Sequence, residues 1–502
     1  MKKYFPQLTA VLFLFLVACG DSNEIEEVVA PINNEPEVVE PNPNAEINNF
    51  IWNGMNQIYL WQGDVPDLAD DRFASEEEYN AYLQASDAPE FFFNSLIYDS
   101  RNVDTFSYFI EDYTEFENQN QGTSLSNGLD FGLARYGSAD NILGYVRLVL
   151  PGSDADGKNI KRGDVFTEVD GKQLTVGNYR SLLYGENTTY TLAISEIIGN
   201  TITPTGESVE LTKTDYTEPS INKVAVFEEA GRKIGYIHYT QFSSQESELN
   251  AAFLELKNEG ITDLILDLRY NPGGWATVST SLASMITGQF KGEVIKKETW
   301  NNRYQTYWES ECPECLVEVF ADRTSGFLSD EAINSLNLNS VHFIGLSGTA
   351  SASESLISGL QPYIDVTLIG EPTFGKYTGS TTIYDSDGVF TNEGANPDHT
   401  YAIQPIIYKF SNKLGGSPQG GLQPDIPISE DLGQMGVIGN PNEPLLRAAL
   451  DDIIGVSAKP VTSKGFEYEK VTDYRLEKKF ATTMIDTKPQ MGEAMKKMQS
   501  KK

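Results

Sequence analysis

The sequence predicts a multidomain α+β protein, in which a small helical domain and a β domain precede an α/β core. The chain has 502 residues, which is too long for one ordinary domain. Apolar residues recur at helical spacing after residue 45, and short strands joined by Gly and Asp turns follow after residue 119. From residue 233 onward apolar strands alternate with helices, a pattern typical of parallel sheets.

The composition is strongly acidic. Asp and Glu number 72 against 37 Lys and Arg, which gives a formal net charge of -35. This charge disfavours binding to nucleic acid or to anionic lipid through a basic face. The hydrophobic content of 40% is ample for packed cores, so the acidity is a surface property of a folded protein.

The first residues indicate export. Lys2 and Lys3 precede an apolar run from Leu8 to Ala18 that is too short to span a bilayer, as expected for a signal peptide over residues 1–19. The run ends at Cys19 in a pattern that resembles the bacterial lipobox, which implies lipidation of Cys19; the alternative is an ordinary signal with a chance cysteine. We expect a lipid-anchored protein of a Gram-negative cell envelope, facing the periplasm or the cell surface, with the anchor as its membrane contact.

The helical and tether regions follow the signal. Residues 20–44 are acidic and proline-rich, and are expected to be a tether. Residues 45–118 predict a small N-terminal helical domain, because Ile47, Ile51 and Met55 recur at helical spacing. Within that domain Ser75 to Glu78 forms a capping box, the signature of a helix start.

Residues 119–218 predict the β domain. The stretches 144–153 and 160–171 alternate strands with Gly and Asp turns, and their landmarks resemble a PDZ domain. A PDZ domain binds the C-terminus of a peptide by adding it as a strand to its sheet. The alternative is a β module without a ligand. Asp154 and Asp156 do not complete a calcium-binding EF-hand loop.

Residues 219–455 predict the α/β core. Parallel sheets place their functional sites at the carboxyl ends of the strands. The expected strands are 234–239, 264–268, 342–346 and 366–369, and the expected helices are 246–257, 275–286, 351–360 and 443–454.

Two of these strand ends carry unusual sequence. Pro272 ends one strand, and Gly273 and Gly274 behind it allow backbone N–H groups to approach a ligand, as in half of an oxyanion hole. The other is a run of small residues, 348–354, that places Ser351 at the N-terminus of a helix. Both features suit a serine nucleophile.

A serine hydroxyl needs a base within hydrogen-bond reach. His238 and His342 lie in apolar strands and His399 lies in a polar loop, so none is a good candidate. Lys376 follows the next strand of the core, and burial can leave a lysine neutral. Taken alone, these residues are better explained by structure, with Ser351 as a helix cap and Lys376 as a solvated turn residue.

The run from Ile234 to Ile426 resembles the catalytic core of the C-terminal processing, or tail-specific, serine peptidases, and the domain order is similar to that of lipoprotein members from Bacteroidetes-like bacteria. The matching pieces are Ile234-Gly235-Tyr236-Ile237, Asp267-Leu268-Arg269 with Asn271-Pro272-Gly273-Gly274, Ser351-Ala352-Ser353-Glu354, Gly370-Glu371-Pro372-Thr373-Phe374-Gly375-Lys376, and Gly421-Leu422-Gln423-Pro424-Asp425-Ile426.

This resemblance implies a crotonase/ClpP-like core and a serine endopeptidase that cleaves proteins or peptides near an apolar C-terminus. Ser351 is then the nucleophile, Lys376 the base, and N–H groups of Gly273 or Gly274 and of Ala352 the oxyanion donors. No cofactor, metal or nucleic acid is implied. The natural substrate, the oligomeric state and whether the PDZ domain gates the site stay open.

One position departs from the family. Members often place Gln four residues after the lysine to orient it, whereas this chain has Ser380, whose hydroxyl is a candidate for the same role. The rival function is therefore a catalytically weak or inactive lipoprotein that binds a peptide or an apolar ligand on the same fold. A third option is a PDZ adaptor that presents peptides to a partner.

Cys312 and Cys315 form a single CxxC. A structural zinc site needs four ligands, and no histidine pair completes one, so we expect no metal. In an oxidising compartment a local disulfide is favoured, with a redox-active pair as the alternative. Residues 456–502 are expected to be a C-terminal extension, with a solvated tail as the default.

Overall fold

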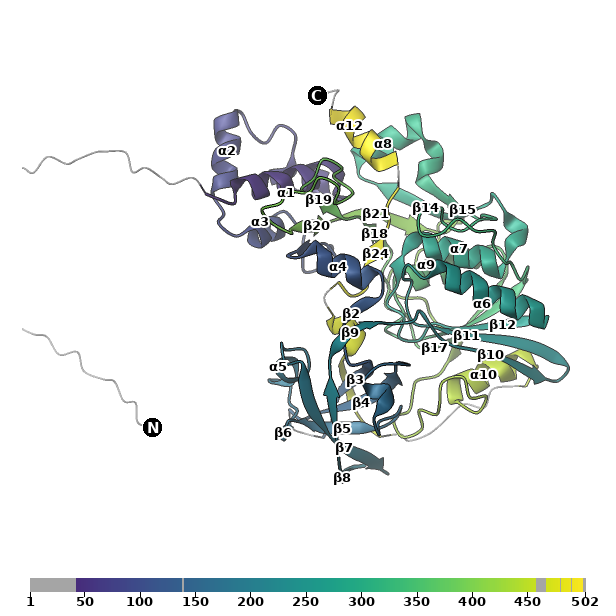
Figure 1. Cartoon of the computed structure of the whole chain (residues 1–502). Coiled ribbons are helices and arrows are strands. Elements are labelled where there is room, and N and C mark those ends of the chain that lie inside the picture. Colours follow the sequence, from purple (N-terminus) through teal and green to yellow (C-terminus); the bar gives the residue numbers. More distant parts are fainter. Residues whose placement is uncertain (1–41, 138–139, 457–465, 479, 489, 500–502) are drawn as a thin grey trace, which may run out of the picture. The chain divides into compact units, whose positions relative to one another are not determined.

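The computed structural model describes residues 42–137, 140–456, 466–478, 480–488 and 490–499 (Figure 1). The proposed signal peptide, Cys19 and most of the tether therefore lie outside the described residues. The chain divides into residues 1–41 and a second unit, residues 42–502, in which all of the following elements lie. Among the described residues, none of the helices has both the length and the apolar character needed to cross a bilayer.

The N-terminal region is helical, as predicted. Ser75 accepts a hydrogen bond from the N–H of Glu78 at the start of its second helix, which is one half of the expected capping box. The aromatic and aliphatic side chains of this region share one hydrophobic cluster with Trp300 and Tyr304 of the core, so the region is packed against the rest of the unit. Its elements are α1 (Ala45–Ile58), η1 (Gln62–Asp64), η2 (Pro66–Leu68), α2 (Glu76–Gln84), α3 (Pro89–Ser95), β1 (Tyr108–Ile110) and α4 (Tyr113–Asn120).

The β domain is an antiparallel sheet around Phe131, Phe166 and Leu192. Its strands are β3 (Leu129–Arg135), β4 (Ile142–Val149), β5 (Val165–Val169), β6 (Lys172–Gln173), β7 (Thr189–Ile198) and β8 (Thr201–Thr212), with η3 (Ala155–Gly157) and the short helix α5 (Tyr179–Leu183). At its two ends β2 (Thr123–Ser126) pairs with β9 (Thr214–Thr217).

The core sheet has the order β10-β11-β12-β16-β17-β22, and every pair from β11 onward is parallel. The strands are β10 (Ile221–Glu229), β11 (Arg232–Tyr239), β12 (Asp263–Asp267), β16 (Ser340–Gly345), β17 (Asp365–Gly370) and β22 (Ile426–Pro427). Helices α6 (Glu246–Glu259), α7 (Ala276–Ile286) and α9 (Ala352–Leu360) pack in one hydrophobic cluster with the sheet, and α10 (Pro444–Ile453) packs in another. The predicted α/β core is confirmed.

A second six-stranded sheet has the order β13-β24-β18-β21-β14-β15. Its strands are β13 (Gly274–Trp275), β24 (Met484–Ile485), β18 (Thr378–Ser380), β21 (Ile406–Ser411), β14 (Val294–Trp300) and β15 (Val317–Val319). Helices η4 (Gly288–Phe290), α8 (Asn302–Glu311) and η5 (Pro313–Leu316) lie along the chain between these strands. A small sheet of β1, β20 (Ala402–Gln404) and β19 (Ile383–Tyr384) ties the N-terminal region to the core.

The C-terminal extension is part of the fold, and the prediction of a solvated tail is wrong for its described residues. Strand β23 (Glu469–Asp473) pairs with β3 of the β domain, followed by α11 (Tyr474–Glu477). Strand β24 then lies between β13 and β18, and both of its residues are buried. Helix α12 (Gln490–Gln499) packs through its methionines into the cluster shared with the N-terminal region.

Candidate active site

Ser351 lies in a strained turn between β16 and α9. Its φ of 63° is in the left-handed region that L residues rarely adopt, which is typical of a residue held for a purpose by its surroundings. Ser351 is fully buried and begins α9 in the capping-box arrangement that the sequence predicts, with its side chain facing the backbone N–H of Glu354. The Oγ makes no hydrogen bond of ordinary geometry among the described residues. The hydroxyl is therefore free to bond an incoming group.

The Glu354 carboxylate joins the Ser351 turn to the loop that carries Lys376. Oε2 accepts hydrogen bonds from the N–H groups of Ser351 (2.8 Å) and Lys376 (2.9 Å). Oε1 accepts from the Gly375 N–H (2.6 Å) and the Thr373 hydroxyl (2.5 Å). Burial raises the pKa of Glu354, and these four donors act against that rise. One buried carboxylate thus fixes the backbones of both candidate catalytic residues.

Lys376 lies between β17 and β18 and is buried, with 1% of its surface exposed. Its Nζ donates to the carbonyl oxygen of Thr482 at 2.6 Å and lies 4.7 Å from the centre of the Phe106 ring. Burial lowers the pKa of Lys376 to about 7, while the negative charges of Asp104 and Glu354 act in the opposite direction. A lysine with this pKa is half neutral at neutral pH, as a general base requires.

The double glycine lies directly against Ser351. A β-carbon at Gly273 would lie 2.7 Å from the Ser351 Cβ and 3.1 Å from the Ala352 nitrogen, so the residue has to be glycine. A β-carbon at Gly274 would lie 2.1 Å from the Phe242 carbonyl oxygen. The N–H of Gly273 already donates to Asn271 Oδ1 at 2.9 Å, so Gly274 and Ala352 are the better oxyanion donors. The structure thus argues against Gly273 as a donor.

Ser380 is not placed to orient Lys376. Its hydroxyl donates to the Met484 carbonyl oxygen at 3.0 Å and accepts from the Gln404 side chain at 3.1 Å. The first bond joins β18 to β24 within the second sheet, and the second joins β18 to β20 of the small sheet. The expectation that Ser380 takes the place of the family's glutamine is corrected by this arrangement, in which Thr482 and not Ser380 bonds the amine.

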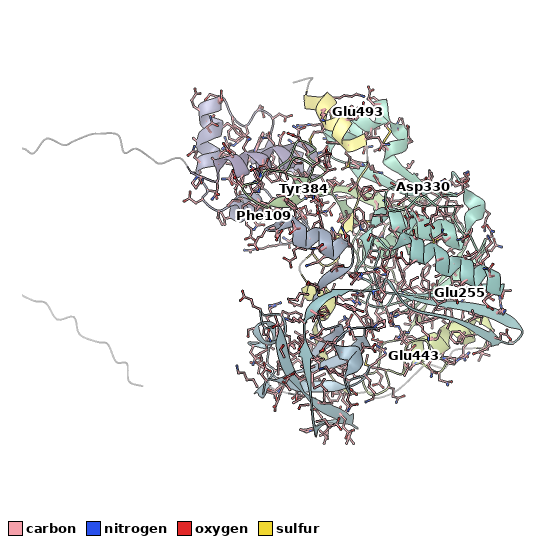
Figure 2. All side chains as sticks on the ribbon, viewed as in Figure 1. Phe109, Glu255, Asp330, Tyr384, Glu443 and Glu493 are labelled. Atoms are coloured by element: carbon pink, nitrogen blue, oxygen red, sulfur yellow. A yellow bond between two sulfur atoms is a disulfide. The ribbon has the colours of Figure 1, made fainter. Side chains whose placement is uncertain are left out.

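A buried ion-pair network lies behind the glycine turn. Arg269 is fully buried and donates to both oxygens of Glu443, labelled in Figure 2, at 2.8 Å each, and also to Asp267. Burial raises the pKa of Glu430, but the positive charges of Arg162 and Arg269 outweigh this and hold it at about 2. Because Arg162 belongs to the β domain, the network joins that domain to the strand end that carries the glycines.

A cleft of about 370 Å³ opens in front of the double glycine. This volume lies in the range of roughly 300–1,000 Å³ that is usual for ligand-binding pockets. Its walls come from the glycine turn, the β domain and the C-terminal segment, and include Phe242, Gly273, Gly274, Trp275, Lys213, Tyr474 and Thr482.

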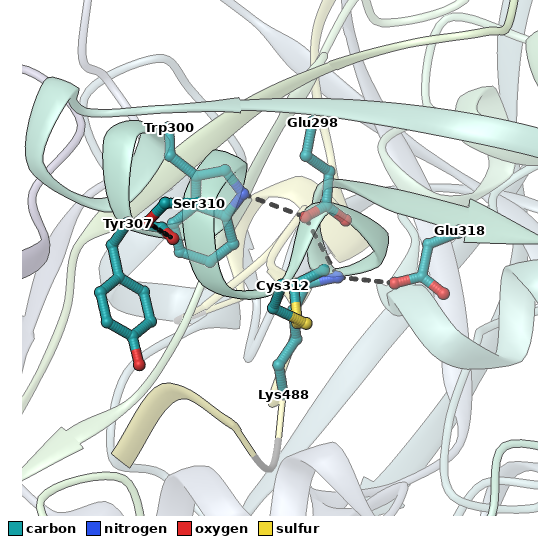
Figure 3. The surroundings of a disulfide bond; sticks show 8 residues. Glu298, Trp300, Tyr307, Ser310, Cys312, Glu318 and Lys488 are labelled. Atoms are coloured by element: carbon teal, nitrogen blue, oxygen red, sulfur yellow. Dashed lines mark hydrogen bonds and ion pairs between the residues drawn. A yellow bond between two sulfur atoms is a disulfide. The ribbon is translucent and has the colours of Figure 1, made fainter. Parts of the chain in front are cut away.

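Cys312 and Cys315 are joined by a disulfide, with their Cα atoms 5.4 Å apart (Figure 3). Beside it Glu298, Glu318 and Asp486 lie close enough together to share an ion. Lys488 bonds to Glu298 at 3.1 Å and to Glu318 at 2.8 Å, and Lys296 bonds to Glu298 at 3.1 Å. The two ammonium groups offset two of the three carboxylate charges of this cluster.

Sequence reasoning missed three contributors to the site. Thr482 supplies a backbone carbonyl, Phe106 a ring face, and Asp104 a negative charge near Lys376. The motif containing Glu354 predicts a helix cap, and a signal for its larger role is its position three residues after a candidate nucleophile. No sequence pattern points to the other three.

Comparison with known proteins places these residues in a family. Residues 233–428 match the model of peptidase family S41, and residues 46–108 match the model of the peptidase S41 N-terminal domain. Ser351, Lys376 and both glycines lie inside the first match. These matches and the curated relatives support a serine peptidase, a hydrolase of peptide bonds.

The curated relatives cover part of the chain. A chloroplastic C-terminal processing peptidase of Tetradesmus obliquus is 26% identical over 310 residues, which is 59% of this chain and 60% of the relative. A CtpA-like serine protease of Staphylococcus aureus (strain COL) is 26% identical over 55% of this chain. The chain spans about half the length of that second relative, 51%.

A solved structure shows the same fold. The crystal structure of a Bacteroides fragilis NCTC 9343 protein assigned as an S41 protease is 22% identical, with a TM-score of 0.62. The similarity covers 81% of this chain and 97% of the other. The chain has the mixed α/β fold of the S41 peptidases with its N-terminal domain, and it belongs to peptidase family S41.

Proposed function

We propose that this chain is a serine endopeptidase that cleaves proteins or peptides near their C-termini with Ser351 and Lys376. The observation that carries the proposal is a buried lysine, with its pKa lowered to about 7, whose backbone shares the Glu354 carboxylate with a serine of unpaired hydroxyl. A buried amine near its pKa at neutral pH is uncommon outside functional sites.

The chemistry follows the positions of these groups. The neutral Lys376 amine takes the proton from the Ser351 hydroxyl as Oγ bonds to the substrate carbonyl carbon. The N–H groups of Ala352 and Gly274 stabilise the resulting oxyanion. The C–N bond then breaks, and Lys376 returns its proton to the leaving amine. Water, deprotonated by Lys376, hydrolyses the acyl ester and restores Ser351.

The first experiment measures cleavage of an unfolded reporter with an apolar C-terminal tail. The chain without residues 1–19 is compared with Ser351→Ala and Lys376→Ala, each checked for an unchanged circular dichroism spectrum. We expect cleavage by the unmodified chain and a loss of about a thousandfold or more in both variants. If the unmodified chain binds the tail without cleaving it, the binding lipoprotein becomes the better description.

We also propose that the β domain is a PDZ module that accepts peptides as an added strand. Supporting this, the edge of β3 already accepts an extended segment, β23, in antiparallel register. The crotonase/ClpP-like relationship of the core is proposed on the parallel sheet with helices in two hydrophobic clusters. Titration of the β domain edge with apolar C-terminal peptides, followed by fluorescence of the adjacent tyrosines, tests the first point.

Lipid anchoring at Cys19 in the envelope of a Gram-negative, Bacteroidetes-like bacterium is proposed on the sequence of the N-terminus. Mass spectrometry of the mature protein tests this proposal. A diacylated or triacylated Cys19 adds the mass of its fatty acids, and the Cys19→Ala variant should lack this added mass. Protease shaving of intact cells then distinguishes surface display, in which the protein is digested, from a periplasmic location, in which it is protected.

A further inference from the structure

The C-terminal segment reaches the proposed base of the active site. The Lys376 Nζ donates to the carbonyl oxygen of Thr482, 106 residues later in the chain, at 2.6 Å. Thr482 is 6% exposed, and strand β24 begins two residues later, at Met484. The contact is therefore made inside the protein, where a hydrogen bond is stronger than in water.

A neutral amine acts as a base through one lone pair, and its direction is fixed by where the N–H bonds point. The Thr482 carbonyl is an acceptor, so it takes one N–H of Lys376. The Phe106 ring lies 4.7 Å from Nζ and presents its negative face to a second N–H. These two partners leave the lone pair of Lys376 uncommitted. Among the described residues Ser351 Oγ makes no hydrogen bond, to Lys376 or to any other group, so the proton transfer requires the two side chains to approach one another when substrate binds.

Ser380, which was expected to orient Lys376, makes its hydrogen bonds to other residues. The Ser380 hydroxyl bonds to Met484 and Gln404, and the Ser380 carbonyl accepts the N–H of Asp486 at 2.9 Å. Two of these three bonds are made to the C-terminal segment. Ser380 thus holds in place the segment that supplies the acceptor.

The Thr482 backbone is strained in a way that presents its carbonyl. Its φ is 59° and that of Phe480 is 64°, conformations that a β-branched and an aromatic residue rarely adopt. Thr483 holds the turn, since its hydroxyl donates to the Phe480 carbonyl at 2.6 Å and bonds to the Tyr108 hydroxyl at 2.8 Å. Strain of this kind persists where the surroundings impose it, often at functional sites.

We propose that the backbone carbonyl of Thr482 is the positioning group of Lys376, so that the C-terminal segment 480–486 completes the active site. The proposal rests on the proposed peptidase function. It assigns to a main-chain acceptor the role expected of a side chain at position 380.

The test compares two substitutions at one position of the full-length chain. Thr482→Gly accepts a φ of 59° and can keep the carbonyl in place, whereas Thr482→Pro fixes φ near −65° and moves it. Both remove the same side chain. We expect kcat of the Pro variant to be about tenfold or more below that of the Gly variant, with KM altered to the same extent in both, since the fall concerns the base and not binding.

A pH profile and urea unfolding separate positioning from structural damage. We expect the pH midpoint of kcat to differ between the Pro and Gly variants while their free energies of unfolding are equal, which a general loss of packing would not permit. If Thr482→Pro does not fold, Thr483→Val is used in its place, because it removes the two hydroxyl bonds of the turn and preserves shape. Equal kcat in the Pro and Gly variants overturns the proposal. A rise of kcat in the Pro variant also overturns it, because the segment would then be an obstruction.

A second readout does not depend on turnover. In a chain labelled with ¹³C-lysine, the Cε resonance of Lys376, identified by its loss in Lys376→Arg, is recorded for both Thr482 variants. We expect it to differ between Thr482→Pro and Thr482→Gly; identical resonances contradict the proposal. Should the unmodified chain cleave nothing, the peptidase function fails, and this resonance still decides whether Thr482 positions the amine.

Discussion

At the scale of single residues, the site depends on placing ionisable groups where water cannot reach them. Lys376 and Glu354 are both buried, and burial moves their pKa values toward neutrality from opposite sides. A buried lysine alone would be a cost to folding. The lowered pKa leaves the Lys376 amine partly unprotonated at neutral pH, as the proposed general base requires.

The pKa of Lys376 predicts the pH dependence of hydrolysis. The amine is the base when it has lost its proton, so kcat/KM should rise about tenfold per pH unit below about 7 and level off above it. Asp104→Asn removes a negative charge that raises this pKa, so the midpoint should move to lower pH. A pH–rate profile of both proteins provides the measurement; a midpoint that stays above 9 in the unmodified chain would contradict a buried base.

Glu354→Gln should disrupt the site without changing its shape. The glutamine amide has one acceptor oxygen, whereas the carboxylate has two. Its NH₂ group would face hydrogen-bond donors such as the Thr373 hydroxyl and the Gly375 N–H, and it cannot accept a hydrogen bond from them. We expect a loss of about 2–4 kcal/mol in the free energy of unfolding, measured with urea, together with a large fall in kcat. The control is Glu248→Gln on the exposed side of α6, which should change neither quantity.

The sequence predicted some site residues and missed others for a physical reason. The contributions of Ser351, Lys376 and the two glycines depend on residue type, which is visible in the sequence. The resemblance to a family then made these positions specific. Thr482 contributes a backbone carbonyl. Because every residue has this group, no sequence pattern can predict the contribution. The direction in which a carbonyl points is decided by tertiary packing, here by Thr483 and Tyr108.

At the scale of elements, the sequence predicts the long strands of the core but not the shortest strands of the second sheet. The core strands β11, β12, β16 and β17 were predicted nearly to their ends because they are apolar along their length. Strands β13 and β24 have two residues each, too few for any periodic pattern. Yet β13 directly follows Gly273, which lies against Ser351, and β24 pairs with β13.

The close approach of β13 to Phe242 predicts the effect of Gly274→Ala. The new methyl group would lie 2.1 Å from the Phe242 carbonyl oxygen, and φ at this position is 133°. We expect destabilisation by about 3 kcal/mol or more, measured by thermal unfolding, and loss of hydrolysis. Gly63→Ala is the matched control, because an added methyl there meets nothing within 4 Å. Equal melting temperatures for the two variants would contradict the close contact between β13 and Phe242.

At the scale of the whole molecule, the C-terminal extension (residues 456–502) contacts, through its described residues, regions that the sequence predicts to be separate domains. Arg475 of α11 is buried, and its guanidinium bonds to Asp130 of the β domain at 2.5 Å and to Glu218 at 2.6 Å. The sequence predicted domain types but not this coupling, because buried ion pairs between distant segments have no local signature. Removing the arginine leaves buried carboxylates without a counter-charge.

Arg475→Met should therefore destabilise the protein by about 3–5 kcal/mol in urea unfolding. Arg180→Met provides the comparison, since Arg180 also pairs with a glutamate, Glu477, but its side chain is 70% exposed. That change should cost much less stability than Arg475→Met, because water screens the exposed pair. Limited proteolysis of the Arg475 variant is expected to release the extension first. A loss no larger than that of the Arg180 variant would show that Arg475 does not tie the extension down.

The late position of β24 in the chain has a consequence for biosynthesis. Lys376 leaves the ribosome 106 residues before Thr482, an interval of roughly 5–20 s at usual rates of synthesis. Throughout that time the growing chain carries Ser351 and Lys376 but lacks the carbonyl that bonds the amine and strand β24, which lies between β13 and β18 in the second sheet. On the proposed function, we therefore expect a copy of the chain that ends before residue 480 to be inactive.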